Sequence, residues 1–157
     1  MRRSTVVLVS LLMTLAGCAT TRQPVAHSNL PHKAADAILC EQQIRSWQAR
    51  GLQTEAQYQQ IAGKPTDRID WKFLEVWLPT DDKHTRQVAA EVGNFAARAS
   101  NPVQIVVYVK SREHDALVMA GIKEGASASG ARNKARVEHV INGRYQPMIQ
   151  VRYQEEK

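Results

Sequence analysis

Two segments in the middle of the chain alternate between apolar and polar residues, which is the pattern of a strand with one buried face. In residues 103–110 the apolar row is Val103, Ile105, Val107 and Val109. In residues 71–78 the row is Leu74, Val76 and Leu78, and Pro79 follows it. Because proline cannot donate to a ladder, we predict that this first strand ends there.

Between these two strands the apolar spacing changes to that of a helix. Thr80, Asp81 and Asp82 offer amino-terminal caps, and apolar residues then recur until residue 101: Val88, Val92, Phe95 and Ala99. A second helix is predicted over residues 116–123. The small residues that follow, 125–131, have the sequence Gly-Ala-Ser-Ala-Ser-Gly-Ala and are predicted to be a flexible connection.

Residues 132–141 fit two patterns. As a helix they would group Ala131, Ala135, Val137 and Ile141, whereas as a strand they would alternate Ala135, Val137, His139 and Ile141. The strand would run into Asn142-Gly143, a dipeptide that favours a tight hairpin. Residues 148–153 alternate again and predict a final strand with a polar, basic outer face.

The order strand, helix, strand, helix, strand predicts a two-layer α/β (α+β) domain over residues 67–157. A short helical hairpin is expected before it, over residues 34–66. Its first helix carries a stripe of Ala37, Cys40, Ile44 and Trp47 and ends at Gly51. Its second helix would begin at Thr54-Glu-Ala-Gln57, which has the spacing of a capping box.

Two features of this reading concern burial. Cys40 lies on the helical stripe, which favours a core thiol over a reactive one. Trp71, Phe73 and Trp77 share one face of the first strand, opposite its apolar row. If the apolar row fills the core, these aromatic residues need cover from the helical hairpin or from a partner.

The amino terminus reads as an export signal. Arg2 and Arg3 form a basic region, residues 6–13 form an apolar region too short to span a bilayer, and Leu15-Ala16-Gly17 precedes Cys18. This Leu-Ala-Gly-Cys sequence resembles the lipobox of bacterial lipoproteins. The resemblance implies that residues 1–17 are removed and that Cys18 carries diacylglycerol on its thiol and an acyl chain, such as palmitate, on its new amino terminus.

The same resemblance implies a location. Residue 19 is Ala rather than the Asp that retains lipoproteins in the inner membrane, so we expect an outer-membrane anchor with the polypeptide facing the periplasm. Residues 18–33, with Pro24 and Pro31, read as a flexible tether. Without the leader the 21 basic residues become 19 against 15 acidic ones, a charge of +4 instead of +6, and no nucleic-acid partner is expected in the periplasm.

Residues 103–140 resemble a divergent OmpA-like, peptidoglycan-associated domain. That family has a strand, a loop with an Asp, and a helix that bears an Arg; here they would be residues 103–110, Asp115, and a helix over residues 129–137. The resemblance implies that Asp115 and Arg132 hold the ammonium and carboxylate of a peptidoglycan stem peptide. Arg136, one helical turn later, would complete a candidate anion-binding face.

The strand reading of residues 132–141 leads to a different resemblance. Strand, helix, strand, helix and then a hairpin is similar to the secretin N-domain type of small lipoproteins in type IV secretion and conjugation machines. In that case the strands and helix faces would be protein-protein contacts, and the partners would be proteins of an envelope secretion complex.

No catalytic or metal-binding pattern stands out. The histidines His27, His32, His84, His114 and His139 lack ligand spacing, and no cysteine pair accompanies them. Ser111, His114 and Asp115 are triad residue types, but no nucleophile-elbow motif surrounds them. We therefore expect a non-enzymatic protein without a metal or cofactor, apart from the lipid on Cys18.

Overall fold

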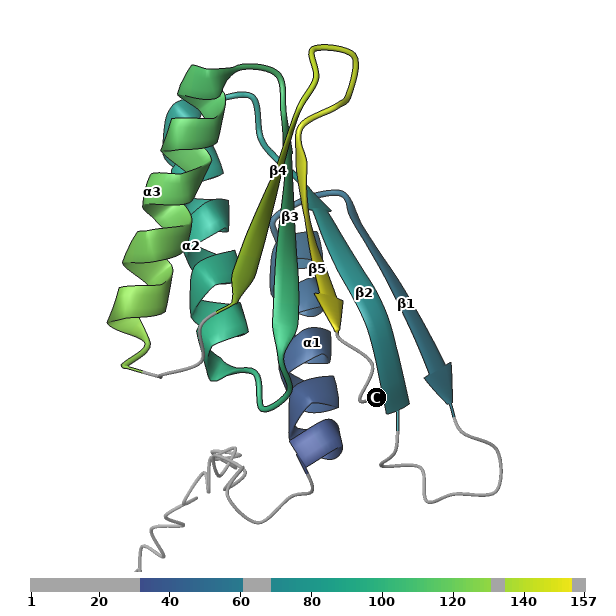
Figure 1. The fold of residues 1–157 in the computed structure, drawn as a ribbon. Helices are drawn as coiled ribbons and strands as arrows, with labels where there is room; N and C mark the ends of the chain where they lie inside the picture. Colours follow the sequence, from purple (N-terminus) through teal and green to yellow (C-terminus); the bar gives the residue numbers. More distant parts are fainter. Residues whose placement is uncertain (1–31, 61–68, 131–134, 154–157) are drawn as a thin grey trace, which may run out of the picture.

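The computed structural model describes residues 32–60, 69–130 and 135–153, which form three helices and a mixed five-stranded sheet (Figure 1). The predicted α+β class is therefore confirmed. The elements in chain order are α1 (His32–Ala49), β1 (Thr54–Gln60), β2 (Ile69–Trp77), α2 (Asp82–Arg98), β3 (Val103–Val109), α3 (Arg112–Ala128), β4 (Arg136–Ile141) and β5 (Met148–Tyr153).

The strands lie in the order β1-β2-β5-β3-β4. β5 follows all the others in the sequence, yet it is inserted in the middle of the sheet and is antiparallel to both β2 and β3. Its register places Val151 beside Leu74 on one side and beside Ile105 on the other. The apolar rows of the three central strands are thus aligned on one face of the sheet.

All three helices cover that face, so the predicted two-layer arrangement is confirmed. In Figure 1, α2 and α3 run side by side to the left of the sheet. In the same view α1 is seen behind β3 and β5, on the helix-covered face. Trp47 of α1 and Val88 and Val92 of α2 are buried together with the apolar rows of β2, β3 and β5. The core therefore lies between one helical layer and one sheet face.

Two side chains start the helices that follow β2 and β3. Asp81 accepts a hydrogen bond from the backbone N–H of His84 at 2.9 Å, which confirms the cap expected at residues 80–82. Ser111 accepts one from the N–H of His114 at 3.2 Å, so α3 starts at Arg112, four residues before the predicted position of Ala116. Each cap satisfies an amide that has no partner within its helix.

The prediction of a flexible connection at residues 125–131 is wrong for its first part, because α3 continues to Ala128. The small residues there serve close packing of α3 against α2. A Cβ added at Gly125 would lie 1.7 Å from the carbonyl oxygen of Ala90, and one added at Gly93 would lie 2.0 Å from that of Ile122. At these crossings the two helices touch through their backbones.

The helical hairpin is half correct. Its first helix is confirmed as α1, which ends at Ala49. Gly51, which follows, has the left-handed conformation typical of a helix end, with φ of 75°. The second helix is wrong, because Thr54–Gln60 is the edge strand β1, antiparallel to β2. Capping-box spacing is a short-range signal, and pairing with β2 outweighs it. In the paired strand Ala56 packs against the core and Glu55 points away from it.

Residues 136–141 are a strand and not a helix. β4 pairs with β3 in parallel and places Val137 beside Ile105. The tight hairpin expected at Asn142-Gly143 is wrong, because β4 and β5 lie on opposite sides of β3 and do not pair. Instead the connection passes over the end of β3, where the Asn142 N–H donates to the carbonyl of Val109 at 2.9 Å.

Candidate functional site

The side of the sheet that faces away from the helices is the candidate site, and we call it the open face. Registers and burial assign its side chains, which alternate with the core residues along each strand. The described members are Glu55, Gln57, Phe73, Glu75, Trp77, Gln104, Val106, Tyr108, Arg136, Glu138, Val140, Met148, Gln150 and Arg152.

A polar network crosses the three central strands of the open face. The Gln150 amide donates to Glu75 Oε1, and its own carbonyl oxygen accepts from Nε of Arg152. A terminal nitrogen of Arg152 donates to the Tyr108 hydroxyl at 3.2 Å. Gln150 in the central strand therefore joins an acid on β2 to a base on its own strand, and the base reaches β3.

Glu75 is the most unusual member of this network. It is 9% exposed although it lies outside the helix-covered core, and Gln150 beside it is 8% exposed. Burial raises the pKa of the Glu75 carboxyl; the hydrogen bond from Gln150 works against this rise, Glu55 adds to it, and Arg152 lowers it. Glu55 lies directly opposite Glu75 in the β1–β2 register, so two carboxylates are neighbours on this face.

Aromatic side chains border the network. Phe73 and Trp77 lie two residues on either side of Glu75 on the same strand, and both are partly exposed. Tyr108 packs edge-to-face against Tyr145, with ring centroids 6.1 Å apart and an interplanar angle of 74°. Tyr145, in the loop before β5, is 52% exposed and extends the aromatic border beyond the strands.

This arrangement excludes α1 as a cover for the aromatic row of β2. Phe73 and Trp77 lie on the open face, whereas α1 packs on the other face through Cys40 and Trp47. The helix therefore does not cover them. The side chain of Trp71, the third member of the row, lies outside the described side chains.

Two of the three residues predicted to bind peptidoglycan, Asp115 and Arg136, lie on opposite faces of the sheet. Asp115 lies in the first turn of α3 and accepts from His139 of β4 at 2.7 Å, on the helix side of the sheet. Arg136 begins β4 on the open face, where its neighbour in β3 is Gln104. Arg132 lies outside the described residues. The sheet thus separates Asp115 from Arg136.

Cys40 is a core thiol, as its place on the helical stripe predicted. It is fully buried and unpaired, and its Sγ lies 3.2 Å from the hydroxyl of Tyr153. Burial raises the pKa of the thiol to about 12, although the hydrogen bond with Tyr153 lowers it and Asp36 adds to the rise. Because the thiolate is the reactive form, we expect Cys40 to be unreactive in the folded chain.

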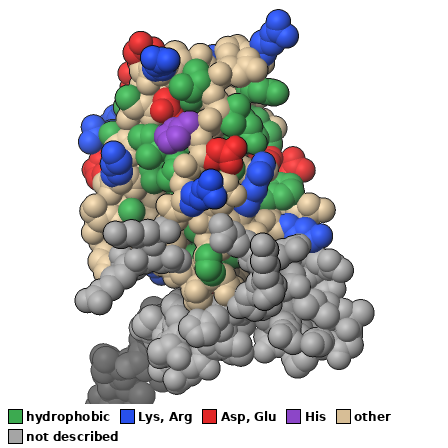
Figure 2. All heavy atoms as spheres, in the orientation of Figure 1, with side chains coloured by type: hydrophobic (Ala, Val, Ile, Leu, Met, Phe, Trp, Pro, Cys, Tyr) green, Lys and Arg blue, Asp and Glu red, His purple; other side chains and the backbone are tan. Residues whose placement is uncertain are grey.

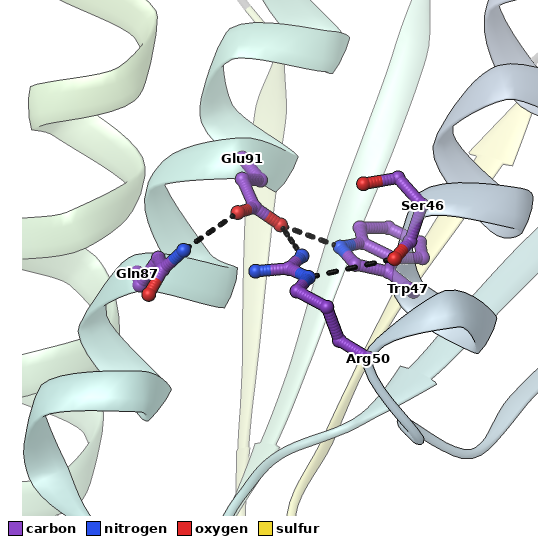
Figure 3. A network of polar contacts seen from close by, with 5 residues as sticks. All are labelled: Ser46, Trp47, Arg50, Gln87 and Glu91. Atoms are coloured by element: carbon purple, nitrogen blue, oxygen red, sulfur yellow. Dashed lines mark hydrogen bonds and ion pairs between the residues drawn. The ribbon is translucent and has the colours of Figure 1, made fainter.

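Two further polar clusters connect α1 to α2 and to the residues that directly follow it. Figure 3 shows Glu91 of α2 accepting from the Trp47 indole at 2.8 Å, from Gln87 at 3.3 Å, and from the Arg50 guanidinium. The buried carboxylate of Asp36 accepts from the backbone N–H groups of Ser100 and Asn101 at 2.7 and 3.0 Å. These acceptors satisfy buried or terminal donors, so we assign them a structural role.

In the described ranges, no three His, Cys, Asp or Glu side chains gather where a metal ion could be held. No helix in those ranges is long and apolar enough to cross a bilayer. Searches of protein-family models, curated proteins and solved structures find nothing that matches the chain. The open face therefore has to be interpreted from its own chemistry.

Sequence reasoning missed Glu75, Gln150 and Arg152 as a group. Each stands at a polar position of an alternating strand, which is a signal for the outer face of the sheet. What the sequence does not contain is the insertion of β5 beside β2, which brings together residues 75 positions apart.

Proposed function

We propose that this chain is an outer-membrane lipoprotein with a non-enzymatic binding role in the bacterial envelope. The Leu15-Ala16-Gly17-Cys18 sequence supports a lipid anchor on Cys18, and the open face supports a binding surface on the periplasmic domain. The structure begins α1 at His32, so the predicted tether loses its last two residues. In this proposal the remaining tether of residues 18–31 holds the domain near the membrane while the open face meets its partner.

The geometry favours protein partners, as in a type IV secretion or conjugation machine. The observation that carries this choice is the open face itself, whose partly exposed aromatic residues Phe73, Trp77 and Tyr108 border a polar centre. Protein interfaces are enriched in aromatic residues and arginine. The strand at Arg136–Ile141 agrees with the strand reading of residues 132–141 from which the secretin N-domain resemblance started, although β4 and β5 do not form the hairpin that the resemblance included.

A peptidoglycan-associated role is the second candidate, and one observation favours it. Glu75 and Arg152 supply a carboxylate and a guanidinium within one network. These are the groups that a zwitterionic stem peptide would need, because a guanidinium binds a carboxylate through two parallel hydrogen bonds. In this version the pair replaces Asp115, Arg132 and Arg136 as the binding residues.

The anchor is tested by membrane fractionation. Cys18→Ser should release the protein from the outer membrane, because one acyl chain already contributes about 0.8 kcal/mol per buried methylene and several chains make attachment stable. Unchanged fractionation of this variant would contradict the lipid anchor.

The two partner classes are separated by two capture experiments with tagged full-length protein. Phe73→Asp places a charge among the aromatic residues of the open face and should abolish co-purification of envelope proteins. Ala120→Asp is the matched control, because it adds the same charge at an exposed position of α3. Retention on purified sacculi that is lost in Glu75→Gln/Arg152→Gln, with no co-purified proteins, would favour peptidoglycan instead.

A further inference from the structure

The charges of the open face differ from those of the chain as a whole. Its described strand residues include two arginines, Arg136 and Arg152, and three glutamates, Glu55, Glu75 and Glu138, which sum to −1. The chain carries +6. Figure 2 shows acidic and basic side chains mixed among hydrophobic ones on the visible side, without a large area of one sign. Two copies that approach through the open face therefore meet little of the repulsion between their net charges.

Within this face Glu75 and Arg152 form an acid-base pair that is not in direct contact. Glu75 lies opposite Gln150 and Arg152 lies opposite Phe73, so the acid and the base are diagonal neighbours. The Cα atoms of such neighbours are about 7–8 Å apart. One carboxylate oxygen of Glu75 accepts a hydrogen bond from Gln150, whose amide is an uncharged donor. Arg152 is exposed, and its described acceptors, Gln150 and the Tyr108 hydroxyl, are both neutral.

A carboxylate and a guanidinium on one face make that face self-complementary. In a two-fold dimer, any contact from residue i to residue j is repeated from j to i. A two-fold axis that lies in the interface, between Glu75 and Arg152 beside Gln150, would set each acid against the other copy's base. Both charges would then gain an ion pair in direct contact, whereas within one chain Arg152 acts on Glu75 only at a distance, with Gln150 between them.

The size of the face is compatible with a weak dimer. Five strands about 4.8 Å apart and about six residues long, at about 3.3 Å per residue, make a face of roughly 24 by 20 Å. Two such faces would bury on the order of 1,000 Å² in total, the lower end for specific interfaces. Phe73, Trp77 and Tyr108, which are partly exposed in the single chain, would be covered.

We infer that the open face binds a second copy of this chain, with Glu75 of each copy paired to Arg152 of the other. This inference goes beyond the proposed envelope role and does not depend on the lipid at Cys18. Because both contacts would use the open face, a chain within the dimer cannot bind an envelope partner through that face at the same time. A dimer would present two tethers and two sets of helices outward, with both sheets in its centre.

The test uses full-length protein in density-matched detergent and sedimentation equilibrium at up to about 100 μM, where a weak interface is populated. Wild type should sediment as a dimer. Glu75→Arg gives a chain with arginine at both positions, and Arg152→Glu gives one with glutamate at both. Each variant alone should be a monomer, because its own copies repel at both contacts.

A one-to-one mixture of the two variants should restore the dimer, since every contact then joins Arg to Glu. A variant that merely damages its own fold would not be rescued in this way. If Glu75→Arg does not give the far-ultraviolet circular dichroism of wild type, Glu75→Gln replaces it and should weaken dimerisation at least tenfold. Arg86→Glu, which breaks a surface pair with Glu124 on the helix side, is the control and should remain a dimer.

Two results would overturn the inference: a monomeric wild type at 100 μM, or a folded variant pair whose mixture stays monomeric. Dimerisation that persists while Cys18→Ser fails to change fractionation would remove the proposed anchor and leave the dimer intact. A monomeric wild type that fractionates with the outer membrane and is released by Cys18→Ser would remove the dimer and leave the proposed anchor intact.

Discussion

Gly125→Ala is the substitution whose effect the structure specifies most sharply. In an exposed helix interior, replacing glycine by alanine stabilises a protein by about 1 kcal/mol. Here the new Cβ would lie 1.7 Å from the carbonyl oxygen of Ala90 and 2.5 Å from its carbon. Both atoms belong to the backbone of α2, so they cannot turn aside as a flexible side chain would.

The clash therefore has to be relieved by moving α3 away from α2. Restoring an ordinary contact of about 3.4 Å requires a local shift of more than 1 Å, and a gap of 0.5–1 Å already loses a quarter to a half of the dispersion energy of the atoms involved. Gly93 and Gly121 form close contacts across the same helix pair and would be disturbed together. Overpacking typically costs 1–3 kcal/mol, so we expect a net loss of about 2 kcal/mol.

Urea unfolding followed by circular dichroism measures this loss. With a slope of about 2 kcal/mol per molar, the midpoint should fall by about 1 M. Gly143→Ala is the matched control, because its Cβ would have no atom within 4 Å, and its stability should change by less than about 0.5 kcal/mol. A Gly125→Ala protein as stable as wild type would refute the backbone contact between α2 and α3.

Three further outcomes follow from buried polar groups. Cys40, with its pKa raised to about 12, should react with a thiol reagent at pH 8 only after unfolding, as measured in a Cys18→Ser background. The raised pKa of Glu75 means that this carboxyl binds a proton more tightly in the folded chain than in the unfolded chain. Glu75 therefore increases the stability of the fold as the pH falls towards the usual pKa of a glutamate, and this contribution is lost as the pH rises. Glu75→Gln should flatten that part of the stability curve in urea titrations at several pH values. Glu91→Ala leaves the Trp47 indole without its acceptor and should cost about 1–3 kcal/mol in the same assay, whereas Glu91→Gln should cost less.

The strands that the sequence predicted are those whose apolar row is fully buried. Val103–Val109 and Ile69–Trp77 each alternate clearly, because one face contacts the helices and the other does not. β1 was missed because it is a polar edge strand whose first residues also fit a helix cap. Only its pairing with β2, a tertiary effect, identifies it as a strand.

The long helix α3 was recognised only in part for a similar reason. Gly125 opens the run of small residues that was predicted to be a flexible connection, whereas against α2 it allows two backbones to touch. A single sequence contains the small residues but not the partner that explains them. The same holds for Glu75 and Arg152, whose connection through Gln150 depends on the position of β5 in the sheet.

The central claim, that the open face is where this protein meets its partners, is tested most directly by site-specific photocrosslinking in cells. A photoreactive phenylalanine analogue at Trp77 should give crosslinked species, whereas the same analogue at Ala120 on the exposed side of α3 should give none. Crosslinks at Ala120 with none at Trp77 would contradict the claim and would transfer the binding surface to the helices.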